Sequence, residues 1–525
     1  MRKLRRTLCA VALALAVVIV GATTAMAVPV APNNTPPAAF PPAQTCACHS
    51  QFIDEWKQSM HGQALSDPIF KAKLAEGNTA TNGQIGPFCI TCHGPVATMT
   101  GQVGKTDPAT AAAQGIGCTF CHQVTGTSNP TGNVSLILQP NGVYRAQIAT
   151  PTAPHPTAYS PFHATSTICG SCHNVAHPGN GLPVEATYTE WQNSPQGKAG
   201  IQCQDCHMSS APGEIGPSMG WAAGGGQLRP IYQMTFTGGQ AGLGNSVLAT
   251  QMLQSAATIH MIAPSMLDQS KTTSVTVSIT NTGAGHYLPT GLTEIREMWL
   301  SVTMTGSDGK QIELGRHAYG TVLKNAAGKY PAQLWEATGV QSDDRIPPKG
   351  TSVQSYKITF PEGAQYGTLK AQLLYRSVPE TLATKAKAPN PTTVMAETSR
   401  VVYANLAGEK QFNKVYLSEA ASSPLMPLVF AIAGLIVSFG LVIFFVWWGR
   451  RPAKPTAPKP SKAGTDLEAQ APVDDSATTT RPSAGGPSPT PSEAHTPSSW
   501  AERSAGVSEP SVAPAPDAPK DKPAE

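Results

Sequence analysis

The chain has 525 residues, only 13% of them are charged, and its formal net charge at pH 7 is +4. So small and diffuse a charge does not predict a surface that binds nucleic acid. Both ends differ in composition from the middle, so the folded part is expected to be shorter than the chain. Of the 11 cysteines, all but Cys9 lie between Cys46 and Cys206. This clustering indicates a domain that carries a functional site.

Residues 1–27 have the pattern of a secretory signal peptide. Basic residues come first, an apolar run follows, and Ala25-Met26-Ala27 matches a small-x-small cleavage site. Cleavage would remove Cys9. The alternative is an uncleaved N-terminal membrane anchor, although the apolar run is short for a span. Residues 28–44 are rich in proline and are expected to form a flexible lead-in.

Residues 45–208 contain the clustered cysteines and few long periodic helices. The segment is rich in Gly, Pro, Ser and Thr, so its own side chains cannot build a conventional apolar core. Another component is expected to fill its interior.

Four segments in this part match the pattern Cys-x-x-Cys-His, the attachment motif of c-type haem. Two thiols three residues apart can bond both vinyl groups of one porphyrin, and the adjacent imidazole can bind the iron. Zinc knuckles, redox-active cysteine pairs and local disulfides also use Cys-x-x-Cys, but none requires a histidine after the second cysteine. The segments are Cys89-Ile-Thr-Cys92-His93, Cys118-Thr-Phe-Cys121-His122, Cys169-Gly-Ser-Cys172-His173 and Cys203-Gln-Asp-Cys206-His207.

A fifth segment, Cys46-Ala-Cys48-His49, has one residue fewer between its cysteines. Cys48 and His49 could still hold a haem through one thioether and the imidazole. The alternative is a degenerate motif with a disulfide or free thiols. Five haem c groups are therefore expected. These large, planar, apolar groups would fill the interior of residues 45–208, which their own side chains cannot fill.

The later part of the chain has a different pattern. Residues 209–271 are expected to be a linker with a helix near 245–260. Within residues 272–410, apolar and polar residues alternate as in half-buried strands, for example at Val275, Val277 and Ile279. This pattern predicts a β-sandwich.

Residues 425–448 form an uncharged apolar run long enough to cross a bilayer, with basic residues directly after it. The alternative is a buried core helix. With the positive-inside rule, this run predicts a single-pass protein of the cytoplasmic membrane whose earlier domains are periplasmic or otherwise extracytoplasmic. Residues 449–525 are proline-rich and are expected to form a disordered cytoplasmic tail.

The expected fold class is thus a haem-packed, mostly α or irregular multihaem cytochrome domain, then a β-sandwich domain, one transmembrane helix and a disordered tail. The chain resembles the multihaem cytochrome superfamily that includes the tetrahaem cytochrome of ammonia oxidation and the hydroxylamine oxidoreductases. Besides the haem motifs, the resemblance is carried by Trp56-x-x-Ser59-x-His61, Glu190-Trp191-x-x-Ser194, Cys203-Gln-Asp-Cys206-His207-Met208, Gly285-His286-Tyr-Leu-Pro289-Thr290-Gly291 and Arg345-Ile-Pro-Pro348.

The resemblance implies that most of the irons have a second histidine ligand. His61 matches the distal ligand of the Trp-x-x-Ser-x-His motif, and His286 is expected to be a ligand supplied by the β domain. His155, His163 and His177 are further candidates; His260 is a weaker one. The alternative for each is a surface or hydrogen-bonded histidine, and His317 and His495 are assigned to that class. Met234 stands where relatives often have a histidine, so either a ligand is lost or Met234 replaces it.

The leading functional hypothesis is electron transfer between redox partner proteins in or at the membrane, with the chain anchored there by its one helix. The competing hypothesis is an enzyme in which one open haem acts on a small nitrogen or sulfur compound. Its support is weaker, because the Cys-x-x-Cys-Lys motif of pentahaem nitrite reductases is absent from the sequence. A third possibility is a scaffold component whose β domain and tail recruit partners.

Overall fold

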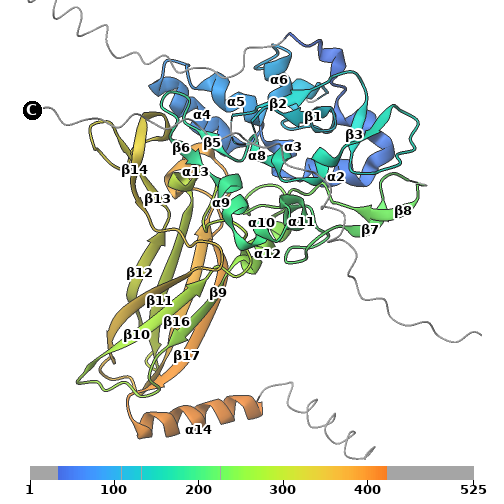
Figure 1. The fold of residues 1–525 in the computed structure, drawn as a ribbon. Helices are drawn as coiled ribbons and strands as arrows, with labels where there is room; N and C mark the ends of the chain where they lie inside the picture. The colour runs from blue at the N-terminus through green and yellow to red at the C-terminus, as the bar shows by residue number, and fades with distance from the viewer. Residues whose placement is uncertain (1–33, 108, 130, 132, 225, 423–525) are drawn as a thin grey trace, which may run out of the picture. The chain divides into compact units, whose positions relative to one another are not determined.

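The computed structural model describes residues 34–422, except 108, 130, 132 and 225. Helices dominate the first part of this range, residues 34–245, here called the N-terminal region, which runs from blue to green in Figure 1. Strands dominate residues 258–403, here called the β region, which runs from green to orange.

The helices of the N-terminal region are short, and several begin at a side chain that caps the first turn. Asp67 caps one by accepting a hydrogen bond from the N–H of Ile69, and Pro68 follows at the first helical position. The α-helices are α2 (Ser50–Lys57), α3 (Met60–Gln63), α4 (Pro68–Ala80), α5 (Gly86–His93), α6 (Pro95–Met99), α7 (Cys118–Cys121), α8 (Thr167–Gly170), α9 (Thr187–Asn193), α10 (Pro195–Lys198) and α11 (Cys203–His207). The 3-10 helices are η1 (Pro37–Ala39), η2 (Ala43–His49), η3 (Ala111–Ala113) and η4 (Pro161–Ala164).

Small sheets lie between these helices. The N-terminal region therefore contains more strand than the mostly α or irregular domain that the sequence predicted. Each sheet has two strands, and only the pair β3–β4 is parallel. Such short pairs cannot be stable alone, so they depend on what packs around them. The pairs are β1 (Val124–Thr127) with β2 (Leu136–Leu138), β3 (Tyr144–Ala146) with β4 (Thr157–Tyr159), β5 (Val175–Ala176) with β6 (Pro183–Glu185), and β7 (Ser218–Trp221) with β8 (Leu228–Ile231).

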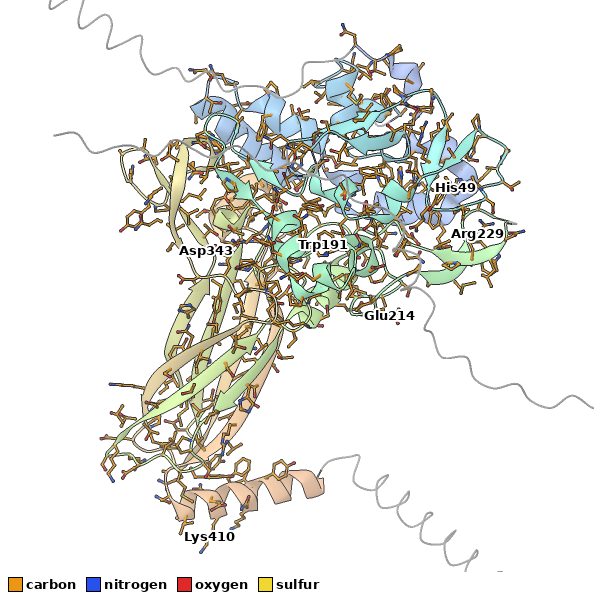
Figure 2. All side chains as sticks on the ribbon, in the orientation of Figure 1. His49, Trp191, Glu214, Arg229, Asp343 and Lys410 are labelled. Atoms are coloured by element: carbon orange, nitrogen blue, oxygen red, sulfur yellow. The ribbon has the colours of Figure 1, made fainter. Side chains whose placement is uncertain are left out.

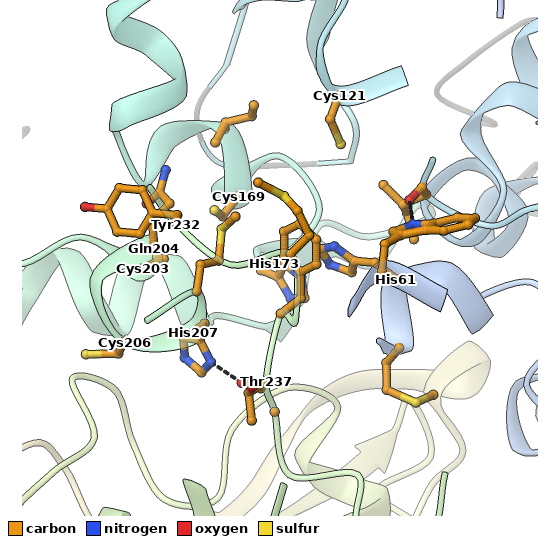
Figure 3. Close-up of a pocket in the computed structure, with 18 of the residues that line it drawn as sticks. His61, Cys121, Cys169, His173, Cys203, Gln204, Cys206, His207, Tyr232 and Thr237 are labelled. Atoms are coloured by element: carbon orange, nitrogen blue, oxygen red, sulfur yellow. Dashed lines mark hydrogen bonds between the residues drawn. The ribbon is translucent and has the colours of Figure 1, made fainter. Parts of the chain in front are cut away.

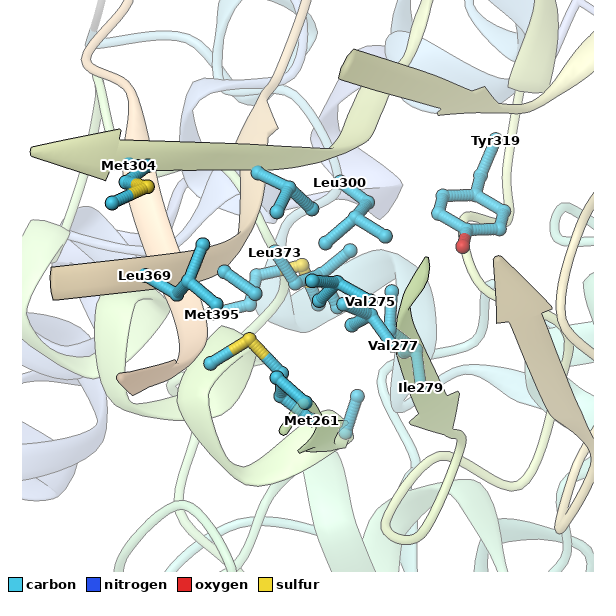
Figure 4. Packing of buried hydrophobic residues seen from close by; sticks show 14 of the residues in the cluster. Met261, Val275, Val277, Ile279, Leu300, Met304, Tyr319, Leu369, Leu373 and Met395 are labelled. Atoms are coloured by element: carbon cyan, nitrogen blue, oxygen red, sulfur yellow. The ribbon is translucent and has the colours of Figure 1, made fainter. Parts of the chain in front are cut away.

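The β region consists mainly of two antiparallel sheets that share one apolar core (Figure 4). Val275, Val277 and Ile279 of β10 are fully buried, and their neighbours face outward, as period-two alternation requires. Helix α12 (Ser246–Ala256) leads into the first strand. One sheet has the order β15 (Thr351–Thr359), β10 (Thr272–Thr280), β9 (Thr258–Ile262), and the other has β12 (Gln311–Tyr319), β11 (Glu297–Gly306), β16 (Tyr366–Arg376), β17 (Thr393–Tyr403).

The remaining elements of the β region lie beside these sheets. Strands β13 (Thr321–Asn325) and β14 (Ala337–Asp343) form a hairpin, η5 (Thr293–Ile295) and η6 (Leu334–Glu336) are single turns, and α14 spans Leu406–Ser422. Helix α13 (Glu380–Ala386) packs against α4 of the N-terminal region. Ile69 joins Val378, Leu382 and Ala383 in one buried cluster there, so the two regions share apolar contacts.

The fold class and the single-pass localisation expected from the sequence both required a transmembrane helix. Within residues 34–422, apart from the four omitted positions, no helix is long and apolar enough to cross a bilayer. This finding corrects both predictions. The expected span at 425–448, the signal peptide at 1–27 and the tail at 449–525 lie outside the described residues.

Candidate functional site

One large cavity runs through the N-terminal region and reaches the edge of the β region. Its volume is about 2120 Å³, far more than one small ligand requires. The histidine of every predicted attachment motif lines it, together with four of the predicted second ligands. These lining histidines are His49, His93, His122, His173, His207, His61, His155, His163 and His286.

Each regular attachment motif forms one helical turn. Residues three apart on such a turn lie on the same side, so the two thiols of a motif point the same way. Helix α5 ends with His93, α7 contains Cys118 and Cys121, α8 contains Cys169, and α11 contains the whole fourth motif. The shorter fifth motif lies on η2, whose backbone departs from helical geometry at Cys46.

The histidine of every motif has its Nδ1 atom engaged, which fixes the direction of its ring. His93 Nδ1 lies 3.1 Å from the carbonyl oxygen of Ala64, and His122 Nδ1 lies 2.7 Å from that of Arg145. A carbonyl can only accept, so Nδ1 carries the proton and Nε2 keeps its lone pair for a metal. The other partners are the carbonyl of Ala222 for His49, Glu185 Oε1 at 3.1 Å for His173 and the carbonyl of Thr237 at 2.5 Å for His207.

Four of these histidines face a second histidine. The ring centres of His122 and His163 are 5.8 Å apart with an interplanar angle of 8°, and those of His207 and His286 are 6.2 Å apart at 18°. Two imidazoles that bond one metal from opposite sides, each at about 2 Å, have ring centres roughly 6 Å apart. The donor set therefore fits haem iron with two axial histidines. The other pairs are His61 with His173 at 6.2 Å and 25°, and His49 with His155 at 6.3 Å and 50°.

The site of His93 differs from the other four. Its ring stacks on Phe70 of α4, with centres 3.8 Å apart and planes at 8°. No histidine ring is stacked on His93 within the part of the chain that the structure describes. Phe70 therefore covers the face of the His93 ring, and the edge of that ring, where Nε2 would bond a metal, has no facing histidine among the described residues.

Burial keeps several of these imidazoles neutral, which is the form that binds a metal. Loss of hydration, together with the neighbouring His173, His207 and His93, lowers the pKa of His61 to about 3. The same desolvation lowers the pKa of His207 to about 4 and that of His163 to about 4. His61 Nδ1 is buried without a hydrogen-bond partner (Figure 3 shows His61 beside His173).

Contacts between cysteines of different motifs give the order of the sites. The side chain of Cys46 contacts that of Cys118, and Cys169 contacts Cys203. Cys92 contacts Cys172, and Cys121 is close enough to Cys172 and Cys169 to interact electrostatically. The motif of His173 is thus adjacent to three others, and the motif of His49 adjoins that of His122.

Other histidines named from the sequence lie elsewhere. His177 is buried outside the cavity lining, where its Nδ1 accepts a hydrogen bond from the N–H of Gly179, and its Nε2 has no partner. The structure therefore does not bring His177 to a motif histidine. His260 lies on β9 and His317 on β12, and Met234 lines the cavity.

Sequence reasoning missed an internal repeat that positions two parts of the site. In both copies, the tryptophan indole donates to a backbone carbonyl, and a serine hydroxyl caps the next turn. Trp56, Ser59 and Gly62 of the first copy correspond to Trp191, Ser194 and Gly197 of the second. At both glycines an added Cβ would lie within 2.3 Å of the tryptophan carbonyl oxygen, so the turn requires glycine. The spacing Trp-x-x-Ser-x-x-Gly could have revealed the repeat.

The repeat puts Gln196 where the first copy has His61. Gln196 donates to the carbonyl of Ala284 at 3.3 Å, two residues before His286. The second copy therefore contacts a loop of the β region where the first copy has a histidine.

Closely spaced Cys-x-x-Cys-His turns, paired imidazoles and one continuous cavity define a multihaem c-type cytochrome, and haem c is its cofactor.

A family model described as cytochrome c554 and c-prime matches residues 45–123. A search of curated proteins finds no match to the chain. The fold is similar to that of a pentahaem cytochrome c552 from Thermochromatium tepidum, at 21% sequence identity and a TM-score of 0.53, over 70% of this chain and 100% of that chain. A CARDB domain from Pyrococcus furiosus matches 28% of this chain and 85% of its own length, at 12% identity and a TM-score of 0.16, which is too low to support an argument.

Proposed function

We propose that this protein is a pentahaem electron-transfer cytochrome that exchanges electrons with redox partner proteins. The observation that supports this most is the set of four histidine pairs, with ring centres 5.8 to 6.3 Å apart, facing four of the five motifs. Bound haem c supplies one-electron oxidation and reduction at iron. Two axial imidazoles leave no iron position for a substrate, which suits electron transfer.

The contacts among the cysteines support a branched order of sites. The site of His49 adjoins that of His122, which adjoins that of His173; from there the order divides toward His93 and toward His207. Electrons entering at the His49 end would pass the His173 site before reaching either branch. The chain's role is to hold the five sites in contact.

The number of haems is tested by the intact mass of the denatured protein. Five covalent haem increments are expected, because η2 directs Cys46 and Cys48 toward the cavity and His49 pairs with His155. Cys48→Ala should remove one increment and leave the other four. Four increments in the unaltered protein would contradict the assignment of the first site.

A second candidate function rests on the haem expected at His93, which no histidine ring faces among the described residues. If that haem keeps an open iron position, it could bind and convert a small nitrogen or sulfur compound, with the other haems supplying electrons. The reduced protein should then bind one carbon monoxide per five haems, as measured by its absorbance change. His61→Ala should raise the stoichiometry to two per five haems, because it removes the histidine that faces His173.

His317→Ala is the matched control for this test. His317 lies on β12 and does not line the cavity. The stoichiometry of carbon monoxide should therefore stay unchanged in His317→Ala. Absence of carbon monoxide binding in the unaltered protein would rule out the open site and leave electron transfer alone.

A further inference from the structure

Three motifs singled out in the sequence meet at one buried carboxylate. Glu190 lies on α9 of the N-terminal region and is only 8% exposed. Its Oε2 accepts hydrogen bonds from the N–H of Tyr287 at 3.1 Å and from the hydroxyl of Thr290 at 2.8 Å. Both donors belong to the loop between β10 and β11 that carries His286.

Arg345 pairs with the other oxygen of this carboxylate. Its Nη1 lies 2.5 Å from Glu190 Oε1, and its guanidinium also makes two bonds of 2.8 Å to Asp343, which Figure 2 labels on β14. The guanidinium carbon lies 5.0 Å from the ring centre of Tyr287. The planar guanidinium thus bonds both carboxylates, which lysine could not reproduce.

Two further side chains hold the loop. Asn281, fully buried, donates to the carbonyls of His286 at 2.8 Å and Ile346 at 3.2 Å. Thr187 binds the hydroxyl of Thr290 at 2.8 Å. The imidazole of His286 is oriented by the carbonyl of its neighbour Tyr287, 2.9 Å from Nδ1.

The two copies of the repeat differ at the position of the histidine. The second copy of the repeat has Gln196 in place of a histidine, and Cβ of Gln196 would lie 3.2 Å from a Cβ at Gly285. His207 faces an imidazole that comes from the β region. That imidazole is aligned only if the loop stays docked on α9.

We infer that Glu190 and Arg345 are positioning residues that lock the His286 loop of the β region onto the site of His207. The inference rests on the proposed function, in which His286 is an axial ligand. Without the carboxylate, Arg345 loses one partner, the N–H of Tyr287 and the hydroxyl of Thr290 lose their acceptor, and His286 is free to withdraw.

The test counts high-spin haem in the full protein with all haems attached, by electron paramagnetic resonance, with a redox titration on the same sample. Glu190→Gln should add to the spectrum of the unaltered protein a high-spin signal approaching one haem in five, and it should shift the potential of one haem. Thr290→Val removes the hydrogen bonds of this hydroxyl to Glu190 and Thr187 but leaves no charge unpaired, so it should give a smaller share of the same signal. Glu397→Gln, which removes an exposed carboxylate paired with Lys370 at 3.0 Å, should change neither.

His286→Ala distinguishes a failure of the positioning role from a failure of the proposed ligand role of His286. If His286→Ala adds the high-spin signal and both Glu190→Gln and Thr290→Val keep the spectrum of the unaltered protein, the positioning role is overturned and the ligand assignment survives. If His286→Ala itself keeps the normal spectrum, the ligand assignment fails and the inference with it. Should Glu190→Gln not accumulate, Thr290→Val decides alone, and a spectrum equal to that of the unaltered protein overturns the inference.

Discussion

His286→Ala is expected to convert one low-spin haem of the five to a high-spin or water-ligated form. The ring of His286 lies 6.2 Å from that of His207, and its Nδ1 is engaged by the carbonyl of Tyr287, so Nε2 is the nitrogen available to the metal. Axial ligand identity is a principal control on haem potential, so one potential should shift as well. Electron paramagnetic resonance with a redox titration measures both changes.

His317→Ala is the control for this prediction. His317 also belongs to the β region, but it lies on β12, and its recorded ring contact is with Tyr319. Its removal should leave the spectrum and all potentials unchanged. A normal spectrum in both variants would mean that the β region takes no part in coordination.

The chemistry of the site could be predicted from the sequence because it is local. Cys-x-x-Cys-His places two thiols and an imidazole on one turn, whatever the rest of the fold does. The alternation of Val275, Val277 and Ile279 likewise depends only on the period of a strand, and these side chains are fully buried.

The pairing of ligands could not be predicted, because it depends on contacts distant in the sequence. His61 comes from the first copy of the repeat, yet it faces His173 rather than His93, which is nearer in the sequence. His177, only four residues from His173, turns outside the cavity because its ring binds the backbone of its own loop. Spacing along the chain favoured His177, and the tertiary fold separates it from the site.

In the sequence, Glu190 was only one residue of a motif to which no role could be assigned. The role of a buried carboxylate can be inferred only from its partners, which here are the loop of His286 and Arg345. The membrane-spanning helix was predicted from hydropathy alone, and the fold class and localisation that depended on it are the predictions corrected here.

The two regions differ in how they fill their interiors. The β region has a large core of its own side chains, in which Leu300, Met304, Leu369 and Leu373 are fully buried. In the N-terminal region, the cluster around Phe40, Val96, Met99 and Phe120 is small by comparison. The cavity of about 2120 Å³ occupies the place where a core would stand.

Preventing haem attachment is therefore expected to unfold the N-terminal region. Without haem the cavity lining loses its packing partners. Removing even one large buried side chain costs about 2–5 kcal/mol, and domains are stable by only roughly 5–15 kcal/mol. The chain expressed without haem attachment should thus lose its helical circular dichroism, and protease should cut between residues 45 and 208 at least tenfold faster than in the haem-bound protein, a factor that corresponds to about 1.4 kcal/mol. Cleavage within strands β10 to β17 should change much less, since their core contains no predicted haem site. Equal protease resistance of residues 45–208 with and without haem would show that the chain builds this region unaided.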